Sequence, residues 1–215
     1  MMIHCIPSGP FATNAYIIGC PATHKAAIID PGVDSFDAIN ELLEKQSFLP
    51  EKILLTHSHW DHIGDAAKCK EHFKIPISIH PEDLPNLEKP GSDHLPLMQP
   101  IPPAKADHLL SDGDTLSIGN TSWKVIHTPG HSPGGICFYN EENAILISGD
   151  TLFQGSIGNI SFPTSNPDAM WKSLKKLSAL PPETQVYPGH GPSTTLAEES
   201  WLPQAQQIFG PSARR

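Results

Sequence analysis

The hydrophobic pattern in the first part of the chain predicts strands that alternate with helices. Apolar and β-branched runs that end at Gly or at Asp-Pro-Gly predict strands at residues 11–19 and 26–30. Apolar residues then recur at helical spacing, which predicts a helix over residues 34–46 with Asp34 as its cap. A further apolar run predicts a short buried strand at 52–56. This order is typical of α/β proteins.

The rest of the chain continues this alternation. We expect helices at residues 61–73 and 166–180, a proline-rich loop at 81–105, and strands at 75–80, 114–119, 122–128, 135–139, 143–150 and 184–189. Asn166 is the expected cap of its helix. Thr195 and Glu198 form a capping box that predicts a terminal helix, broken or kinked at Pro203. Two sheet-rich halves that each carry helices predict a layered α/β sandwich with the helices outside, as one domain over residues 1–215.

Composition narrows the class of partner. The 215 residues include 14 Lys and Arg against 23 Asp and Glu, a formal charge of −9. A nucleic-acid backbone requires clustered basic side chains, so we expect a small-molecule substrate and no nucleic acid. The start of the chain lacks the pattern of a secretory signal, no stretch approaches 18 apolar residues, and the four cysteines form no CxxC pair. These features predict a cytoplasmic protein without a membrane-spanning helix or disulfides.

Histidine is the unusual residue, because three of the 12 histidines lie beside an aspartate in LLTHSHWDHIGD, residues 54–65. His57 and His59 follow the strand-like run and point the same way if the backbone is extended, so they can share a metal ion. Asp61 and His62 come where the next helix begins and leave in another direction. Four ligands within six residues cannot close one tetrahedral zinc site without severe strain. The segment is therefore predicted to supply two neighbouring metal ions.

Three further candidate ligands lie at or just after strand ends: His131 in a Pro/Gly turn, and Asp150 and His190 at the ends of buried strands. Seven donors suit two metals, since one zinc ion takes about four. We assign three donors to a first metal, three to a second and one as a bridge: His57, His59 and His131; Asp61, His62 and His190; and Asp150. A carboxylate can bridge because it has two oxygens. A hydroxide between two metals would be the nucleophile, which Asp61 is expected to orient.

The motifs THSHWDH, GHSPGG, SGDTLF and YPGHG resemble those of the metallo-β-lactamase fold, in its glyoxalase II-like branch, over most of the chain. The resemblance implies a four-layer αββα sandwich and two divalent metal ions, zinc first, with iron or manganese as alternatives. It also implies hydrolysis of a thioester such as hydroxyacyl-glutathione. The family's ligand positions fall on the seven residues already selected. Asp30 would then orient ligands, whereas its own pattern equally fits a turn former.

Two departures from the family pattern bear on the substrate. Only 25 residues follow His190 in a chain of 215, so we do not expect the added helical region with which full-length glyoxalase II enzymes hold glutathione. Residues 155–161 read GSIGNIS where many short relatives read GSIGR-D, which places Asn159 and Ser161 where Arg and Asp are expected. The loss of an arginine there predicts a different preference for substrate charge.

Three other functions compete with a dinuclear thioester hydrolase. Persulfide dioxygenases resemble the same branch but use a single iron ion, and they are the main alternative. A non-catalytic metal-binding scaffold predicts degraded ligands, yet none of the seven is missing. β-Lactamases usually have other ligands at the positions of Asp61 and Asp150. The complete donor set therefore favours the hydrolase.

Overall fold

Two six-stranded β-sheets form the centre of the computed structural model, which describes residues 1–210. The first sheet follows chain order: β1 (Met2–Ser8), β2 (Thr13–Cys20), β3 (Lys25–Ile29), β4 (Leu49–Leu54), β5 (Ile77–Ile79) and β6 (His108–Leu109). The second sheet also keeps neighbouring strands adjacent: β7 (Thr115–Ile118), β8 (Thr121–His127), β9 (Ile136–Asn140), β10 (Ile145–Gly149), β11 (Gln185–Pro188) and β12 (Thr194–Thr195). The chain therefore completes one sheet before it begins the other.

Both sheets are mixed. β1, β2 and β3 pair antiparallel, and β4, β5 and β6 then add as parallel neighbours. In the second sheet the neighbours pair antiparallel except β10 and β11, which are parallel with Ile145 opposite Gln185. Parallel pairs need crossover connections, which usually contain a helix. The long helices between β3 and β4 and between β10 and β11 serve as such crossovers.

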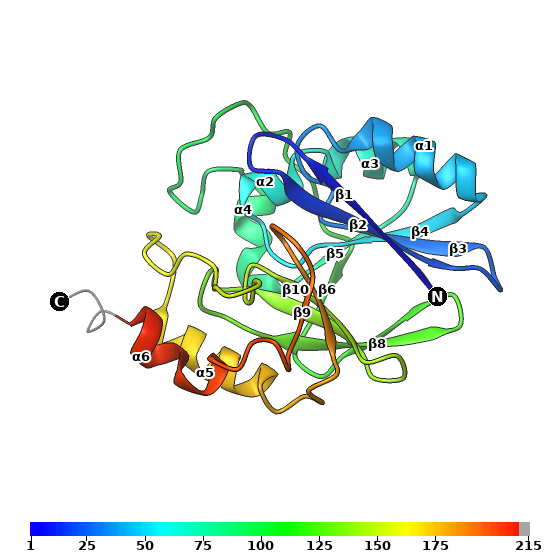
Figure 1. The fold of residues 1–215 in the computed structure, drawn as a ribbon. Helices are drawn as coiled ribbons and strands as arrows, with labels where there is room; N and C mark the ends of the chain where they lie inside the picture. Colours follow the sequence, from blue (N-terminus) through cyan, green and yellow to red (C-terminus); the bar gives the residue numbers. More distant parts are fainter. Residues whose placement is uncertain (211–215) are drawn as a thin grey trace.

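Helices cover the outer face of each sheet, so the molecule has four layers (Figure 1). The first sheet packs against α1 and α3, and the second against α5 and α6. In chain order the helices are α1 (Phe36–Gln46), α2 (Trp60–Ile63), α3 (Ala66–Phe73), η1 (Pro81–Asp83), α4 (Leu84–Glu88), α5 (Pro167–Leu177), η2 (Leu202–Gln204) and α6 (Ala205–Phe209). Within residues 1–210, every helix is too short or too polar to cross a membrane. The αββα sandwich confirms the predicted fold class.

β2 shows how the apolar layers are built. All its residues are buried because both faces of the sheet are covered. Ala15 and Ile17 belong to the cluster on the outer side of the first sheet, whereas Tyr16 and Ile18 belong to the cluster between the two sheets. This alternation follows from the two-residue period of a strand. A third cluster, which includes Met170, lies between the second sheet and α5.

The two predicted helix caps have different outcomes. Asn166 is confirmed as the cap of α5, because its side chain accepts a hydrogen bond from the Ala169 N–H at 3.1 Å. Asp34 does not cap α1, so that prediction is wrong. Asp34 has a left-handed φ of 59°. The Phe36 N–H, at the start of the helix, instead donates a hydrogen bond to Asp65 Oδ2 at 2.9 Å. A cap supplied from a distant turn leaves no local pattern in the sequence.

Other boundaries also differ from the prediction. The helix expected over 61–73 is divided into α2 and α3, because Asp65 between them has a non-helical φ of −106° and ψ of 10°. The expected loop over 81–105 contains η1 and α4, whose Leu87 is buried in the outer apolar cluster. β1 and β6 were not predicted, because β1 is only half buried and β6 has two residues.

The capping box near the end of the chain forms without a helix behind it. The Thr195 N–H donates to Glu198 Oε2 at 3.0 Å, and the Glu198 N–H donates to Thr195 Oγ1 at 3.3 Å. The next residue, Glu199, turns inward and accepts hydrogen bonds from the Gly155 N–H at 2.8 Å and the Thr194 hydroxyl at 2.5 Å. This inward turn replaces the predicted helix, and Pro203 lies in η2 rather than at a helix break.

Candidate metal centre

The seven residues selected from the sequence come together where loops of the two sheets meet. Six of them are buried, and the seventh, His190, has a side chain that is 25% exposed. The first sheet contributes four and the second sheet three: His57, His59, Asp61 and His62 after β4, His131 after β8, Asp150 after β10 and His190 after β11. Both halves of the molecule are therefore needed to complete the site.

Asp30, directly after β3, fixes two of the imidazole rings. Its Oδ1 accepts a hydrogen bond from the Thr56 N–H at 2.7 Å, and its Oδ2 accepts one from the Thr56 hydroxyl at 2.5 Å. His62 Nδ1 lies 3.1 Å from the same Oδ2, and His57 Nδ1 lies 3.0 Å from the Thr56 hydroxyl oxygen. Both rings therefore keep Nε2 free for the site. Of the two interpretations of Asp30, these contacts support the one in which it orients ligands.

Backbone carbonyls fix two more rings in the same way. His131 Nδ1 lies 2.8 Å from the Asn159 carbonyl oxygen, and His190 Nδ1 lies 3.1 Å from that of Phe11. A ring that donates through Nδ1 keeps a lone pair on Nε2. His59 is the exception, since its Nδ1 faces His131 Nε2 at 2.8 Å, whereas its Nε2 is buried without a hydrogen-bond partner among residues 1–210. Four histidines thus present Nε2 to the site, and one presents Nδ1.

Six of the predicted donors fall into two of the side-chain groups that are close enough to hold a metal ion. Within each group, one donor atom of every residue lies within 4.8 Å of the others; the groups are His57, His59 and His131, and Asp61, His62 and His190. In the second group, Asp61 Oδ2 lies 3.3 Å from His190 Nε2 and 3.5 Å from His62 Nε2. Each group is compact enough for its three residues to reach one ion.

Asp150 lies between the two groups. Its Oδ2 is 3.3 Å from His131 Nε2 and 3.5 Å from His190 Nε2, and its Oδ1 is 3.3 Å from His62 Nε2. The carboxylate therefore faces one residue of the first group and two of the second. This is the position that a bridging ligand requires.

The electrostatics of the metal-free site favour charged carboxylates. Burial opposes ionisation of Asp61, but the His62 charge and a hydrogen bond from His190 outweigh it and lower the Asp61 pKa to about 2. Burial also disfavours the His190 cation, yet hydrogen bonds to Asp150 and Asp61 raise its pKa to about 9. Burial, with the nearby His131 charge, lowers the pKa of His59 to about 3. In the metal-free protein at neutral pH, His190 therefore carries a proton beside the ionised Asp61, in the place where a metal ion is expected.

The donor set fits divalent metal ions. His57 Nε2 is buried and has no hydrogen-bond partner among the described residues. A buried polar atom without a partner costs about 1–3 kcal/mol, so this nitrogen needs a partner from outside the chain. Imidazole nitrogens with carboxylate oxygens are the ligands that zinc and other first-row metals prefer. The site is therefore suited to a divalent metal.

The start of β2 holds two of the ligands, a role that sequence reasoning missed. The Thr13 hydroxyl donates to Asp61 Oδ2 at 2.7 Å. Asn14 Nδ2 donates to the carbonyls of Pro188 and Gly191 at 2.9 and 2.8 Å, and the Tyr16 hydroxyl donates to the Pro188 carbonyl at 2.6 Å. These bonds fix the loop that carries His190. The only available signal was a pair of polar residues at the head of an apolar run.

A second supporting residue lies in the segment predicted to be a surface loop. Asp83 is buried, and its carboxylate accepts hydrogen bonds from the Ser58 N–H at 2.9 Å and the Gly134 N–H at 2.6 Å. Asn86 Nδ2 donates to the Ser58 carbonyl at 2.6 Å. Asp83 thereby links the loop of the first three histidines to the loop of His131. Its partners are 25 and 51 residues away, so no local pattern reveals it.

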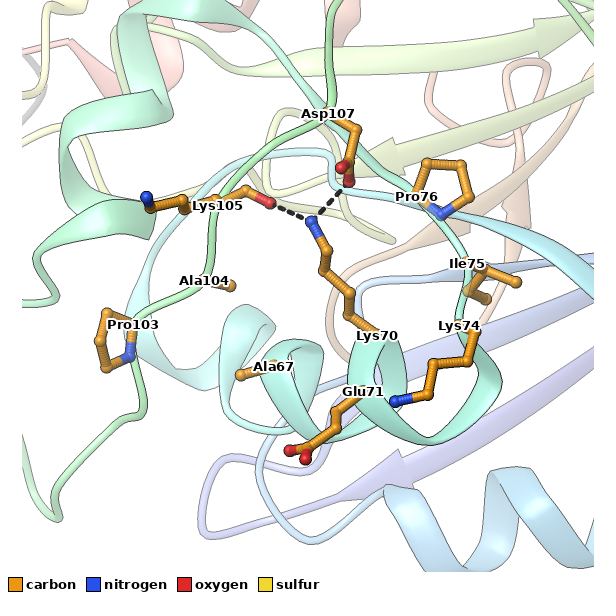
Figure 2. A pocket seen from close by; sticks show the side chains of 10 residues that line it. All are labelled: Ala67, Lys70, Glu71, Lys74, Ile75, Pro76, Pro103, Ala104, Lys105 and Asp107. Atoms are coloured by element: carbon orange, nitrogen blue, oxygen red, sulfur yellow. Dashed lines mark hydrogen bonds and ion pairs between the residues drawn. The ribbon is translucent and has the colours of Figure 1, made fainter.

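A cleft of about 290 Å³ gives access to the donors and is bordered by five of them: His59, Asp61, His131, Asp150 and His190. A larger cavity of about 770 Å³ lies between α3 and residues 103–107 (Figure 2). There Lys70 Nζ is bonded to Asp107 Oδ2 at 2.7 Å and to the Lys105 carbonyl at 2.8 Å. None of the seven donors lines the larger cavity, so the chemistry belongs to the smaller cleft.

The αββα sandwich and the histidine and aspartate donors at its edge define a metal-dependent hydrolase. The chain belongs to the metallo-β-lactamase superfamily, whose model matches residues 8–190.

Three similar proteins illustrate the range of this family. The hydroxyacylglutathione hydrolase GloC of Haemophilus influenzae is 32% identical over 207 residues, covering 93% of this chain and 95% of its own. The crystal structure of the BLEG-1 B3 metallo-β-lactamase is 38% identical with a TM-score of 0.85, and covers 100% of both chains. That of TTHA1623 in a di-iron-bound form is 39% identical with a TM-score of 0.79, covering 92% of this chain and 96% of its own.

Proposed function

We propose that this chain is a dinuclear metal-dependent hydrolase that cleaves a thioester. One observation carries the proposal: the Asp150 carboxylate lies within 3.5 Å of nitrogens from both donor groups. In the proposed site, His57, His59 and His131 would hold one ion. Asp61, His62 and His190 would hold the other, and Asp150 would serve both. Zinc is the first choice of metal, with iron and manganese as alternatives.

The residues of the cleft determine how a substrate would react. When bound, divalent metal ions supply Lewis acidity and lower the pKa of coordinated water. Asp61, held by Thr13 at 2.7 Å, is placed to orient the attacking water. The described residues that line the cleft include no serine or cysteine, so cleavage uses water rather than a protein nucleophile. The similarity to GloC supports a thioester as the scissile bond.

The test combines metal analysis with a substrate panel. We expect about two metal ions per chain and hydrolysis of acyl-thioesters such as lactoyl-glutathione. Asp61→Ala and His190→Ala should each lower the metal content towards one ion and reduce kcat/KM at least a hundredfold, since each removes a ligand. Asp37→Ala, whose side chain is 94% exposed on α1, is the control and should match the wild type.

Other outcomes would replace the proposal. A single iron ion with oxygen uptake on glutathione persulfide would show a dioxygenase. Hydrolysis of a β-lactam by a two-metal protein that leaves every thioester intact would show a lactamase.

A further inference from the structure

The cleft beside the donors is lined by aromatic rings from separate parts of the chain. Apart from the five donors, its lining consists of Phe11, Trp60, Leu95, Phe153, Phe162 and Asn159. They come from the turn between β1 and β2, from α2, from the segment after α4 and from the loop after β10. Asn159 is the one polar residue among these six. An apolar surface thus extends to the donors themselves.

The rings pack directly on the donor side chains. The Phe162 ring centroid lies 5.5 Å from those of His59 and His131. The Phe153 ring lies 5.9 Å from that of His190. Phe162 therefore flanks the first donor group and Phe153 the second. A substrate bond held between the two groups would have an aromatic ring on each side.

Apart from the donor residues, the cleft offers no cationic side chain to a substrate. Among residues 1–210, no lysine or arginine lines it. A carboxylate held against the aromatic side chains, away from the donors, would lose hydration without gaining a basic partner, which is unfavourable. The formal charge of −9 also opposes the approach of anions. The volume of about 290 Å³ is at the lower limit for small-molecule sites, so only a part of a large substrate fits.

We infer that the substrate is a thioester with an apolar, uncharged acyl group that enters this aromatic cleft, on a thiol carrier that brings no carboxylate into it. The inference rests on the proposed thioester hydrolysis. Water adds to the acyl carbon, the C–S bond breaks, and the products are a carboxylate, a thiol and one proton. The cleft then selects the acyl group by apolar contact rather than by ion pairing.

The first experiment separates the acyl group from the carrier. The metal-loaded protein is assayed with four thioesters that combine a phenylacetyl or a lactoyl group with N-acetylcysteamine, which is neutral, or with glutathione, which carries two carboxylates. Because even one methylene in an apolar pocket changes kcat/KM by about 10–200-fold, we expect phenylacetyl to exceed lactoyl at least tenfold on the same thiol. We also expect N-acetylcysteamine to exceed glutathione. Equal rates, or a preference for lactoyl-glutathione, would overturn the inference and leave the hydrolase intact.

Variants locate the preference in the cleft. Phe11→Ala should reduce the phenylacetyl-to-lactoyl ratio at least fivefold, because it removes the cleft-lining ring that packs on Trp60 at 5.3 Å. The substitution keeps the backbone carbonyl of residue 11 that holds His190. Ile208→Ala removes a 45% exposed apolar side chain on α6 and should leave the ratio unchanged. A ratio in Phe11→Ala equal to that of the wild type would contradict the assignment of the acyl group to this cleft.

A binding measurement separates this inference from the proposed reaction. Calorimetry compares two thioethers that cannot be hydrolysed, S-(2-phenylethyl)-N-acetylcysteamine and S-(2-phenylethyl)glutathione. Tighter binding of the neutral thioether, by at least fivefold and weakened in Phe11→Ala, supports the cleft assignment even if no thioester is cleaved, in which case the proposed function alone fails. Equal or tighter binding of the glutathione thioether overturns the inference.

Discussion

Four histidines of the site depend on the group that contacts the ring nitrogen facing away from the site. His57, His62, His131 and His190 each use Nδ1 for a contact outside the site, with Thr56, Asp30 and two backbone carbonyls respectively. These contacts select the tautomer that keeps Nε2 available. The ligand geometry is therefore determined before any ion arrives. A substitution of an outer partner should weaken metal binding without removing a ligand.

Asp30→Ala tests this dependence. We expect the affinity of the Asp61, His62 and His190 group for metal to fall about 10–100-fold, because His62 loses the carboxylate that orients it. Calorimetric titration of the metal-free protein with Zn²⁺ measures the change. Asp37→Ala should bind metal like the wild type, since that side chain is 94% exposed. An unchanged affinity in Asp30→Ala would show that His62 needs no outer partner.

The pH dependence of metal binding follows from His190. Hydrogen bonds to Asp150 and Asp61 raise its pKa to about 9 in the metal-free protein, so its proton must leave before it can bind a metal. Metal affinity should therefore rise between pH 6.5 and 9, about tenfold per pH unit for each proton displaced. The metal-free protein should lose stability over the same interval, because the charged His190 stabilises the fold below pH 6.5 and is neutral above pH 9.

Titrations in two buffers with different ionisation enthalpies count the protons released. His190→Ala should release fewer protons than the wild type at pH 7.5. A metal affinity that stays constant from pH 6.5 to 9 would contradict a raised His190 pKa.

The sequence reveals the donors better than the residues that support them. The seven donors stand out because His and Asp occur at strand ends with regular turn residues around them. Thr13 and Asp83 escape notice because each contacts its partner over a gap of 25 or more residues. A supporting role of this kind depends on the tertiary fold and leaves only an ordinary polar residue in the pattern.

At the scale of elements, the turn after β11 lies so close to Asp150, in the turn after β10, that it has no room for a side chain at Gly189. A Cβ on Gly189 would collide with Asp150 Oδ1 and crowd the His62 ring. Gly189→Ala should therefore displace the central carboxylate, reducing metal content and lowering hydrolytic kcat/KM at least tenfold. Metal analysis and kinetics on the purified variant check this expectation.

Gly155→Ala is the matched control for that substitution. Gly155 has a left-handed φ of 67°, and a Cβ there meets no atom within 4 Å. Its substitution should cost only about 1 kcal/mol of backbone strain and leave the metal content unchanged. If both variants retain their metal, the close packing at Gly189 is not required.

Helix α5 and its cap residue hold the turn that carries His131 through two hydrogen bonds. The Asn166 N–H donates to the Gly130 carbonyl at 2.8 Å, and the Ser173 hydroxyl donates to the Pro129 carbonyl at 2.7 Å. Asn166→Ala removes the side-chain cap and should lower the free energy of unfolding by about 1 kcal/mol. Urea denaturation measures the loss. Asp168→Ala, on an exposed position of the first turn, should have a smaller effect, and an equal loss in both would argue against the cap.

The prediction of elements succeeds where the signal is local and fails where it is not. The start of α5 is predicted correctly because its cap and Pro167 directly precede its apolar face in the sequence, although the helix ends at Leu177 rather than at residue 180. The capping box of Thr195 and Glu198 forms as predicted, yet the chain then follows Glu199 into the interior. The buried Glu199 carboxylate accepts three hydrogen bonds there, and these outweigh the local tendency to form a helix.

At the scale of the whole molecule, the site joins two separately built halves. The apolar clusters of each half are complete without the donors, so we expect the metal-free protein to remain folded. A metal ion that binds only the folded chain adds about 2.7 kcal/mol at a concentration of 100 Kd. For a chain of this size, that corresponds to roughly 5 to 10 °C in Tm.

Differential scanning fluorimetry before and after chelation tests this expectation. Addition of Zn²⁺ should restore the higher Tm. The double variant His57→Ala with His190→Ala should show no shift, since both donor groups are then incomplete. A chelated protein without a cooperative transition would show instead that the fold itself needs the metal.

The bonds between β2 and the His190 loop also constrain when the site can form during synthesis. Asn14 and Tyr16 reach the Pro188 carbonyl across 174 and 172 residues, and His190 reaches Phe11 across 179. The strands of the first sheet are all made before residue 110, but the second donor group is incomplete until residue 190 has been made. The second ion can therefore be held only after the loop of His190 has been made and has joined β2, whereas the residues of the first group, His57, His59 and His131, are synthesised earlier.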